Sequence, residues 1–225
     1  MKPENKVAVV ALRSLPMFAT LSEEKLTGVA QFAVLRRVPR HGVVLSAGDC
    51  IDCIYVILSG GLKVVMGDQD GREVILSMLG PGDFFGEMGV IDDHPRSATV
   101  QATDESSLVV IGQADFQRCM AENNEVALYV MRNLVKRLRL ADRKIESLSL
   151  LDVYGRVARV LLDMAEDREG RKVVTRRVTR QDISQMVGAS REMVSRVMRD
   201  LQLRGLIEEK DGLIWLYDDI DAVKQ

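Results

Sequence analysis

The stretch from Glu125 to about Ser149 constrains this chain more than any other feature, because it contains neither glycine nor proline. Apolar residues recur along it at alternating steps of four and three. They are Ala127, Met131, Leu134, Leu138, Ala141, Ile145 and Leu148. This spacing predicts a long helix of about three heptads that pairs with another helix in a left-handed coiled coil. The charged outer positions favour pairing, although an amphipathic helix can also lie on its own domain.

The sequence before this helix has a different pattern. From Phe32 to Leu108, short β-rich runs alternate with turn signals roughly 8–12 residues apart, which predicts a small β-barrel or β-roll. The clearest strands read CIYVILSG, LKVVMG and EVILSMLG, separated by Gly60-Gly61, Asp70-Gly71 and Gly80-Pro81-Gly82. Helical spacing of apolar residues between Leu12 and Ala30 predicts short helices that pack against this roll.

The sequence after Asp152 is mostly helical and ends in a hairpin. The run DVYGRVARVLLDMAEDREG predicts an amphipathic helix that stops at Gly170. KVVTRR has the composition of a strand, and two short helices are expected between Thr179 and Gly205 around Gly188. The run GLIEEKDGLIWLY predicts a hairpin about Asp211-Gly212. Two helices, a tight turn and a wing make a winged helix-turn-helix.

These patterns predict an α+β protein with three segments: a β-roll domain at 1–124, a dimerisation helix at 125–151 and a winged helix-turn-helix at 152–225. With 47% hydrophobic residues, 28% charged residues and a net charge of −2, the chain has the composition of a soluble globular protein. No apolar run reaches the ~20 residues of a membrane span. Three cysteines make no disulfide framework, so we expect a cytoplasmic protein that does not contact membranes. Cys50-x-x-Cys53 lacks a second ligand pair, so no metal is expected.

The helix-turn-helix segment has the chemistry of a DNA reader. Thr179 with Asp182 forms a predicted capping box, and Ser190 is placed to cap the second helix. The second helix then turns Arg191, Glu192, Ser195, Arg196 and Arg199 outward. Arginine donates two hydrogen bonds to guanine, and glutamate accepts from cytosine N4. Nine basic residues lie between positions 171 and 204 against three acidic ones, a net of +6 suited to DNA phosphates.

The run FFGEMGVIDDHPRSATV, from Phe84 to Val100, has the chemistry of an anion-binding turn. Gly86 lets the backbone approach a ligand, and the residues after it can start a short helix whose N–H groups face an anion. The guanidinium of Arg96 suits a phosphate, Glu87 can accept from a sugar hydroxyl, and Ser97 can add a phosphate contact. The alternative is that Glu87 and Arg96 form a salt bridge that only staples the turn.

From about Leu12 to Tyr217 the chain resembles the family of the cyclic-AMP receptor protein and the fumarate-nitrate regulator (CRP/FNR). The run TRQDISQMVGASREMVSRV is especially similar to that family's DNA-reading segment. The resemblance implies a cytoplasmic bacterial transcription regulator, a homodimer that reads a two-fold symmetric, TGTGA-like DNA site. It implies contacts to DNA from Thr179, Arg180, Ser190, Arg191, Glu192 and Arg196. The loop AEDREGRK corresponds to one that contacts RNA polymerase.

The resemblance also implies a cyclic nucleotide, with Glu87 on the ribose 2′-hydroxyl and Arg96 on the cyclic phosphate. The implied ligand-binding residues are Gly86, Glu87, Met88, Arg96, Ser97, Ala98, Ala141 and Asp142. The receptor protein has threonine and serine where this chain has Ala141 and Asp142. A carboxylate can accept from both guanine N1–H and the guanine 2-amino group, so cyclic GMP and cyclic di-GMP rival cyclic AMP.

Three other readings of the sequence remain. One is a regulator of the same fold that binds no nucleotide, and another is a nucleotide-binding subunit that restrains a catalytic partner and binds no DNA. The third, an enzyme, is disfavoured because no nucleophile–base–acid set is evident in the sequence. The cysteine group that holds the iron–sulfur cluster of the fumarate-nitrate regulator is missing at the N-terminus.

Overall fold

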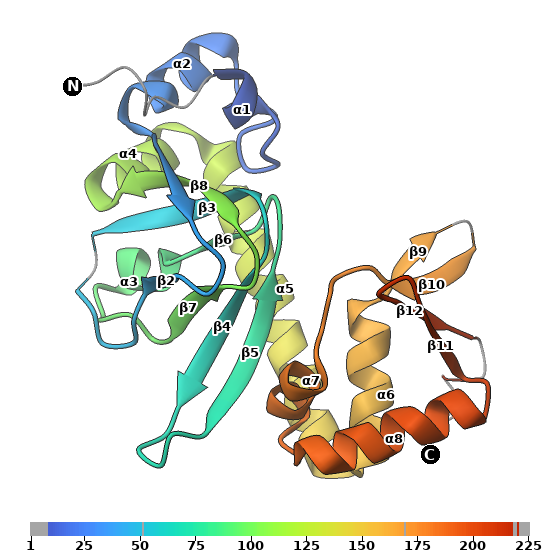
Figure 1. Cartoon of the computed structure of the whole chain (residues 1–225). Coiled ribbons are helices and arrows are strands. Elements are labelled where there is room, and N and C mark those ends of the chain that lie inside the picture. Colours follow the sequence, from blue (N-terminus) through green and yellow to red (C-terminus); the bar gives the residue numbers. More distant parts are fainter. Residues whose placement is uncertain (1–8, 51, 169, 218–219, 221–225) are drawn as a thin grey trace. The chain divides into compact units, whose positions relative to one another are not determined.

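The computed structural model describes residues 9–50, 52–168, 170–217 and 220. The chain is of the predicted α+β class and folds into two compact units, Met1–Lys136 and Arg137–Gln225 (Figure 1). Helix α5 (Asn124–Leu150) contributes residues to both units. Among the described residues, none of the helices combines the length and the apolar character that crossing a membrane requires.

The first unit is the predicted β-roll, built from two antiparallel sheets. Its strands are β1 (Val34–Val38), β2 (Val43–Leu45), β3 (Cys53–Ser59), β4 (Leu62–Gly67), β5 (Glu73–Leu79), β6 (Phe84–Phe85), β7 (Thr99–Ala102) and β8 (Ser106–Gly112). One sheet has the order β1-β8-β3-β6 and the other β2-β7-β4-β5. The three quoted runs form β3, β4 and β5. Positive φ angles at Gly60 and Gly71 mark the predicted turns between them, and a positive φ angle at Gly82 marks the turn that follows β5.

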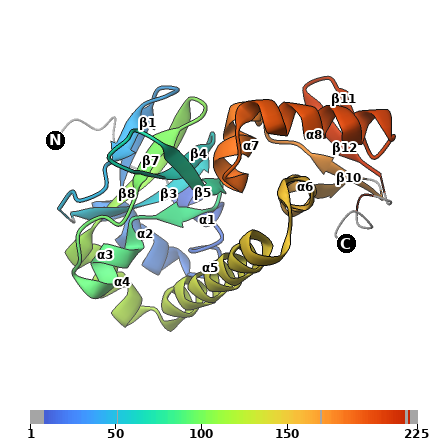
Figure 2. The ribbon, with the colours of Figure 1, turned by 90° about the horizontal axis from the view of Figure 1, so that it is seen from below.

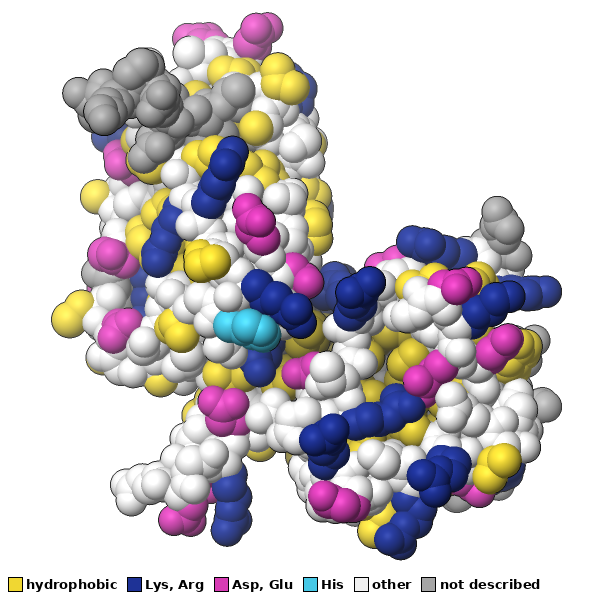
Figure 3. Space-filling model, in the orientation of Figure 1, with side chains coloured by type: hydrophobic (Ala, Val, Ile, Leu, Met, Phe, Trp, Pro, Cys, Tyr) yellow, Lys and Arg dark blue, Asp and Glu magenta, His cyan; other side chains and the backbone are white. Residues whose placement is uncertain are grey.

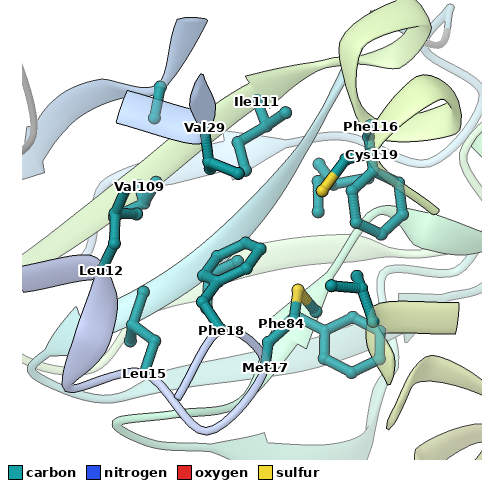
Figure 4. Close-up of a cluster of buried hydrophobic side chains, with 14 of the residues drawn as sticks. Leu12, Leu15, Met17, Phe18, Val29, Phe84, Val109, Ile111, Phe116 and Cys119 are labelled. Carbon is teal, nitrogen blue, oxygen red and sulfur yellow. The ribbon is translucent and has the colours of Figure 1, made fainter. Parts of the chain in front are cut away.

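Two hydrophobic cores fill this unit, one on each side of the first sheet. The helices α1 (Val9–Arg13), α2 (Glu23–Phe32), α4 (Gln113–Glu122) and the start of α5 pack on its outer side, where Phe18, Phe84 and Phe116 are buried (Figure 4). The second core lies between the two sheets and includes Phe85. Phe84 and Phe85 enter different cores because successive side chains of a strand point to opposite faces. Both rings therefore fix β6, and the residue that follows it, in place.

The predicted long helix is confirmed as α5, but α5 carries two apolar stripes where the heptad pattern describes one. Val126 and Val130 are buried in the core of the first unit, and Leu134 packs against the same core. The heptad pattern assigned Leu134 to the pairing seam, but it continues a second apolar stripe spaced by four residues that covers α5's own domain. Other apolar side chains of α5 remain exposed: Met131 at 51%, Val135 at 50%, Leu138 at 62%, Ile145 at 64% and Leu148 at 57%.

The second unit is the predicted winged helix-turn-helix. It contains α6 (Val153–Met164), β9 (Glu166–Arg168), β10 (Arg171–Val174), α7 (Arg180–Val187), α8 (Arg191–Leu203), β11 (Ile207–Lys210) and β12 (Leu213–Leu216). The four strands form one antiparallel sheet in the order β11-β12-β10-β9. Helices α6, α7 and α8 contact one another (Figure 2). The core that they enclose includes Leu161, Ile183 and Met198.

The predicted extension of the first helix of this unit to Gly170 is wrong. Helix α6 ends at Met164, and Glu166–Arg168 form a strand that pairs with β10. All three of these strand residues are exposed, so a longer helix would have had no apolar face to bury. Gly170 instead occupies the hairpin turn with φ of +78°, and its N–H donates to Asp167 Oδ1 at 3.0 Å.

Candidate phosphate-binding turn and nucleic-acid interface

Gly86 is the point at which the backbone leaves β6 and enters α3 (Glu87–Asp92). Its φ of +84° and ψ of +4° place it in the left-handed region, which favours glycine. A Cβ atom at this position would lie 2.6 Å from Nη1 of Arg96 and 3.3 Å from the carbonyl oxygen of Cys53. Both the conformation and the space therefore require glycine, which brings the backbone close to Arg96.

Arg96 is the buried cation of this turn, with a side chain only 2% exposed. Its Nη1 donates to the carbonyl of Gly86 at 2.6 Å, and its Nη2 donates to the carbonyl of Cys53 at 2.6 Å. Nη2 also donates to Asp52 Oδ1 at 3.1 Å. Within the described residues, Nε of Arg96 is buried and has no hydrogen-bond partner. A guanidinium that its own protein satisfies only in part is suited to receive an anion.

The carboxylate beside Arg96 comes from a residue that the sequence did not single out. Asp52 immediately precedes β3, and its side chain is 77% exposed. The Cys53 thiol donates to Asp52 Oδ1 at 3.1 Å. This hydrogen bond is the main cause that lowers the pKa of Asp52; partial burial opposes it, and Arg96 lowers the pKa further. Asp52 is therefore ionised at neutral pH.

The Cys53 thiol stays protonated under the same conditions. Burial is the main cause that raises its pKa to about 11, and the carboxylate of Asp52 acts in the same direction. Cys53 is buried at the start of β3, whereas Cys50 is exposed. Within the described residues, no group of three or more His, Cys, Asp or Glu side chains is arranged to hold a metal ion.

The structure brings the other proposed phosphate-side residues to the same turn. Glu87 opens α3 and is only 2% exposed, which is unusual for a carboxylate. Ser97 is exposed, and its Oγ lies 3.8 Å from Sδ of Met88. Ala98 is buried and directly precedes β7. All of these residues lie in the same segment of the chain as Arg96, at positions 86–98.

The two residues proposed for the nucleotide base lie elsewhere in the chain. Ala141 and Asp142 are both exposed on the part of α5 that belongs to the second unit. Asp142 therefore has a carboxylate that is accessible in the isolated chain.

The helix-turn-helix forms through the local signals that the sequence carried. Asp182 N–H donates to Thr179 Oγ1 at 3.1 Å and Thr179 N–H donates to Asp182 Oδ2 at 2.9 Å, which confirms the capping box at α7. Gly188 ends α7 in the left-handed conformation with φ of +65°. Ser190 then caps α8 by accepting from the N–H of Met193 at 3.2 Å. These caps fix the angle at which α8 leaves the turn.

One face of α8 carries the side chains that the sequence assigned to DNA reading. Arg191, Glu192, Ser195, Arg196 and Arg199 together line a shallow groove of about 360 Å³. The opposite face buries Val194, Val197, Met198 and Leu201 in the core. Lys and Arg side chains, with some carboxylates between them, gather on the face of this unit that Figure 3 displays. The arrangement presents hydrogen-bond donors at the N-terminal half of a helix, where recognition helices contact bases.

Two contacts adjust the charges around this face. The backbone N–H of Glu192 and the hydroxyl of Ser190 lower the pKa of the Glu192 carboxyl, which is thus ionised and ready to accept. Arg180, at the start of α7, forms an ion pair with Glu209 on strand β11. Arg180 is one of the residues that the family resemblance assigns to DNA, and in the structure its guanidinium pairs with Glu209. This contact could not be foreseen from local patterns because the two residues lie 29 positions apart.

Several known proteins are similar to this chain over more than three quarters of its length. The cAMP-activated global transcriptional regulator Vfr of Pseudomonas aeruginosa is 36% identical over 185 residues, which cover 78% of this chain and 85% of Vfr. The cAMP-activated global transcriptional regulator CRP of Pasteurella multocida is 32% identical over 190 residues, covering 81% and 90%. The solved structure of the c-di-GMP-responsive global regulator CLP of Xanthomonas campestris is 29% identical, with a TM-score of 0.72, and covers 87% of this chain and 99% of CLP.

Two family models match the chain in succession. The cyclic nucleotide-binding domain matches residues 35–123, which include the turn with Gly86 and Arg96. The Crp-like helix-turn-helix domain matches residues 155–222, which include α7 and α8. Fold, turn and helix-turn-helix together define a transcription regulator with a cyclic nucleotide-binding domain. The chain belongs to the CRP/FNR family, whose members are transcription regulators rather than enzymes.

Proposed function

We propose that this chain forms a homodimer whose affinity for a two-fold symmetric DNA site is set by a cyclic nucleotide bound at the Gly86–Ala98 turn. The observation that carries this proposal is the buried guanidinium of Arg96, which keeps a donor unsatisfied beside a glycine that no other residue can replace. We assign ligand binding to residues 1–124, pairing to 125–151 and DNA binding to 152–225.

The phosphate end of the ligand fits the turn chemically. A cyclic phosphate carries one negative charge and exposes two oxygens, which match the fork of Arg96. Ser97 adds a hydroxyl donor, and buried Glu87 accepts from the ribose 2′-hydroxyl. Burial strengthens the hydrogen bonds of Arg96 and Glu87, because water does not compete for these two groups.

The base end of the ligand is assigned to α5. Asp142 offers a carboxylate that can accept from N1–H and the 2-amino group of guanine, whereas adenine gives it only the 6-amino group. This chemistry favours cyclic GMP or cyclic di-GMP over cyclic AMP. The relatives support more than one ligand, since Vfr and CRP are described as cAMP-activated and CLP as c-di-GMP-responsive.

Helix α8 is assigned to the major groove of DNA. Arg191 and Arg196 donate to guanine, Glu192 accepts from cytosine, and Thr179, Arg180 and Ser190 hold phosphates. The family resemblance points to a TGTGA-like half-site. A second copy of the chain supplies the second α8, and the two must lie about 34 Å apart to read one turn of DNA.

The homodimer is assigned to the exposed stripe of α5. Met131, Leu138, Ile145 and Leu148 present apolar surface at the spacing of a coiled-coil seam, and a second copy of the same helix would bury it. Nucleotide binding next to this seam would change how the helices pair and so shift the spacing of the α8 helices. The hairpin β9–β10 is the corresponding place for a contact with RNA polymerase in the cytoplasm.

Calorimetric titration with cyclic AMP, cyclic GMP and cyclic di-GMP tests the ligand, and fluorescence anisotropy with a palindromic TGTGA-containing duplex tests DNA binding. We expect at least one nucleotide to bind and to change DNA affinity at least tenfold. Arg96→Ala should abolish nucleotide binding while leaving the protein folded, and Arg191→Ala should weaken DNA binding by roughly 1–3 kcal/mol per half-site.

Each alternative function has its own outcome in these experiments. Heatless titrations with all three nucleotides, with DNA binding retained, would identify a regulator of the same fold that binds no nucleotide. Nucleotide binding without any affinity for DNA would identify a regulatory subunit for another protein.

A further inference from the structure

Resting on the proposed function, we infer that Asp52 is a specificity-determining residue that selects ligands by phosphate charge. It occupies the guanidinium of Arg96 before the ligand arrives and repels a phosphate in proportion to its negative charge. The site would therefore accept a cyclic phosphodiester, which carries one charge, and disfavour the noncyclic phosphomonoester of the same nucleoside, which carries two. The inference identifies how this site rejects the hydrolysis product of its own ligand.

Asp52 is not needed to hold Arg96 in place. The two carbonyl oxygens of Gly86 and Cys53 already accept from Nη1 and Nη2, both at 2.6 Å, whereas Asp52 Oδ1 lies farther away at 3.1 Å. Both carbonyls belong to the backbone at β6 and β3, which pair with each other in the first sheet. Removing the charge of Asp52 should therefore leave the guanidinium where it is.

Asp52 is also the one partner of the three that can leave the guanidinium by rotating a side chain. Its side chain is 77% exposed, whereas that of Arg96 is 2% exposed. An exposed carboxylate that turns away regains water, so its displacement by a phosphate carries little desolvation cost. Asp52 thus pairs with Arg96 when no ligand is bound, and an incoming anion can displace it.

The charge of Asp52 persists at the site after displacement. Asp52 is fixed by its backbone directly before β3, so a carboxylate that has turned away from Arg96 stays within a side chain's length of it. When water screens them almost fully, as at an exposed side chain, two unit charges about 4–6 Å apart change a binding constant by a factor of roughly three to ten. A phosphomonoester has close to two charges above pH 7, so the same neighbour changes its binding constant by about the square of that factor.

The test is calorimetric titration at pH 8 of the wild type and Asp52→Asn, with the cyclic nucleotide that binds the wild type and with its 5′-monophosphate. Asparagine keeps the size and an acceptor for Cys53 and removes only the charge. We expect the cyclic nucleotide to bind Asp52→Asn about three to ten times more tightly. The monophosphate should gain about ten to one hundred times, so the preference for the cyclic form falls.

A matched control separates local from global charge. Glu105→Gln removes the same charge from an exposed position on the roll and should leave both affinities unchanged within twofold. High salt should reduce the effect of Asp52→Asn, as expected for an exposed charge. Equal melting temperatures of the wild type and both variants would show that the comparison is between folded proteins.

The outcomes distinguish this inference from the proposed function. If the wild type binds a cyclic nucleotide but Asp52→Asn binds it no more tightly, or gains equally for both ligands, the charge selection is wrong and the proposed function stands. A loss of affinity in Asp52→Asn would make Asp52 a positioning residue for Arg96 instead. If neither protein binds any of the three cyclic nucleotides, the proposed function fails and this inference fails with it.

Discussion

At Gly86, one hydrogen atom in place of a side chain lets two backbone carbonyls and a guanidinium share a small volume. We expect Gly86→Ala to reduce nucleotide affinity at least tenfold, because the new methyl group would lie 2.6 Å from Nη1 of Arg96. The left-handed φ adds a cost of about 1–2 kcal/mol to folding. Calorimetry and thermal unfolding measure the two effects separately.

Gly71→Ala is the control for this substitution. Gly71 has a similar φ of +76°, but nothing lies within 4 Å of a Cβ built there. It should lose about the same stability and keep its nucleotide affinity. Equal losses of affinity in both variants would mean that strain, and not the contact with Arg96, explains the effect.

The thiol of Cys53 gives the protein a pH-dependent stability at the alkaline end. Its pKa is raised to about 11 by burial, so the folded chain keeps this proton after the unfolded chain, with a pKa near 8.5, has lost it. The unfolded state then binds fewer protons, and the free energy of unfolding falls as pH rises from about 8.5 to about 11. Below pH 8.5 this contribution is constant.

Denaturant unfolding of the wild type and Cys53→Ala between pH 7 and pH 11 tests this sign. The variant should be less stable at pH 7, because a buried side chain is shortened, but should lose less stability as pH rises. Cys50→Ala is the matched control, since Cys50 is exposed. Parallel pH profiles for wild type and Cys53→Ala would contradict the assignment.

At the scale of elements, the ion pair between Arg180 of α7 and Glu209 of β11 links the wing to the first helix of the DNA reader. We expect Glu209→Gln to strengthen DNA binding by roughly threefold to tenfold, because Arg180 is then available to a phosphate and one negative charge is removed. Anisotropy titrations at several salt concentrations measure the gain, which should be similar for specific and nonspecific DNA.

Glu208→Gln tests whether the contact itself matters. Glu208 neighbours Glu209 on β11 but bonds to the hydroxyl of Tyr217 at 2.8 Å rather than to Arg180. A gain in Glu208→Gln as large as that in Glu209→Gln would assign the effect to the net charge of the wing.

Some helices, strands and turns could be predicted from the sequence more accurately than others. The capping box at Thr179 and the Asp211-Gly212 hairpin were predictable because each is made by residues a few positions apart. The end of α6 at Met164 was not, because pairing between Glu166–Arg168 and β10 overrode the helical pattern. Asp52 was missed for a related reason: it lies 44 positions from Arg96, and only the folded sheet brings them together.

At the scale of the whole molecule, the α+β class and its two parts could be inferred from sequence because strands and helices have different hydrophobic periods. The family could be inferred because two motifs resemble those of its members. The assignment of every seam residue could not. A heptad pattern describes one stripe, and α5 carries two: Leu134, which the heptad assigns to the seam, also packs against the core of the first unit. The two apolar stripes of α5 can be told apart only when it is known which face of the helix packs against the β-roll.

The remaining stripe leads to an expectation about assembly. Leu138 is 62% exposed and takes no part in any of the three cores described above. We expect Leu138→Gln to raise the dimer dissociation constant more than tenfold, because burying a leucine contributes roughly 1.5–3 kcal/mol and the dimer has two. Sedimentation equilibrium measures this, and the melting temperature at high protein concentration should change little.

Arg132→Gln, at an exposed charged position of the same helix, should leave the dimer intact. A wild-type protein that sediments as a monomer at micromolar concentration, or a Leu138→Gln variant that dimerises normally, would contradict the pairing of α5.

Because the exposed apolar stripe of α5 is covered only when a second chain binds, the concentration of this protein in the cell also affects regulation. If DNA binding requires a dimer, the occupancy of a promoter rises with the square of the protein concentration when that concentration is low. Synthesis and degradation of this regulator would then set a threshold for gene expression, even when its small-molecule effector is plentiful.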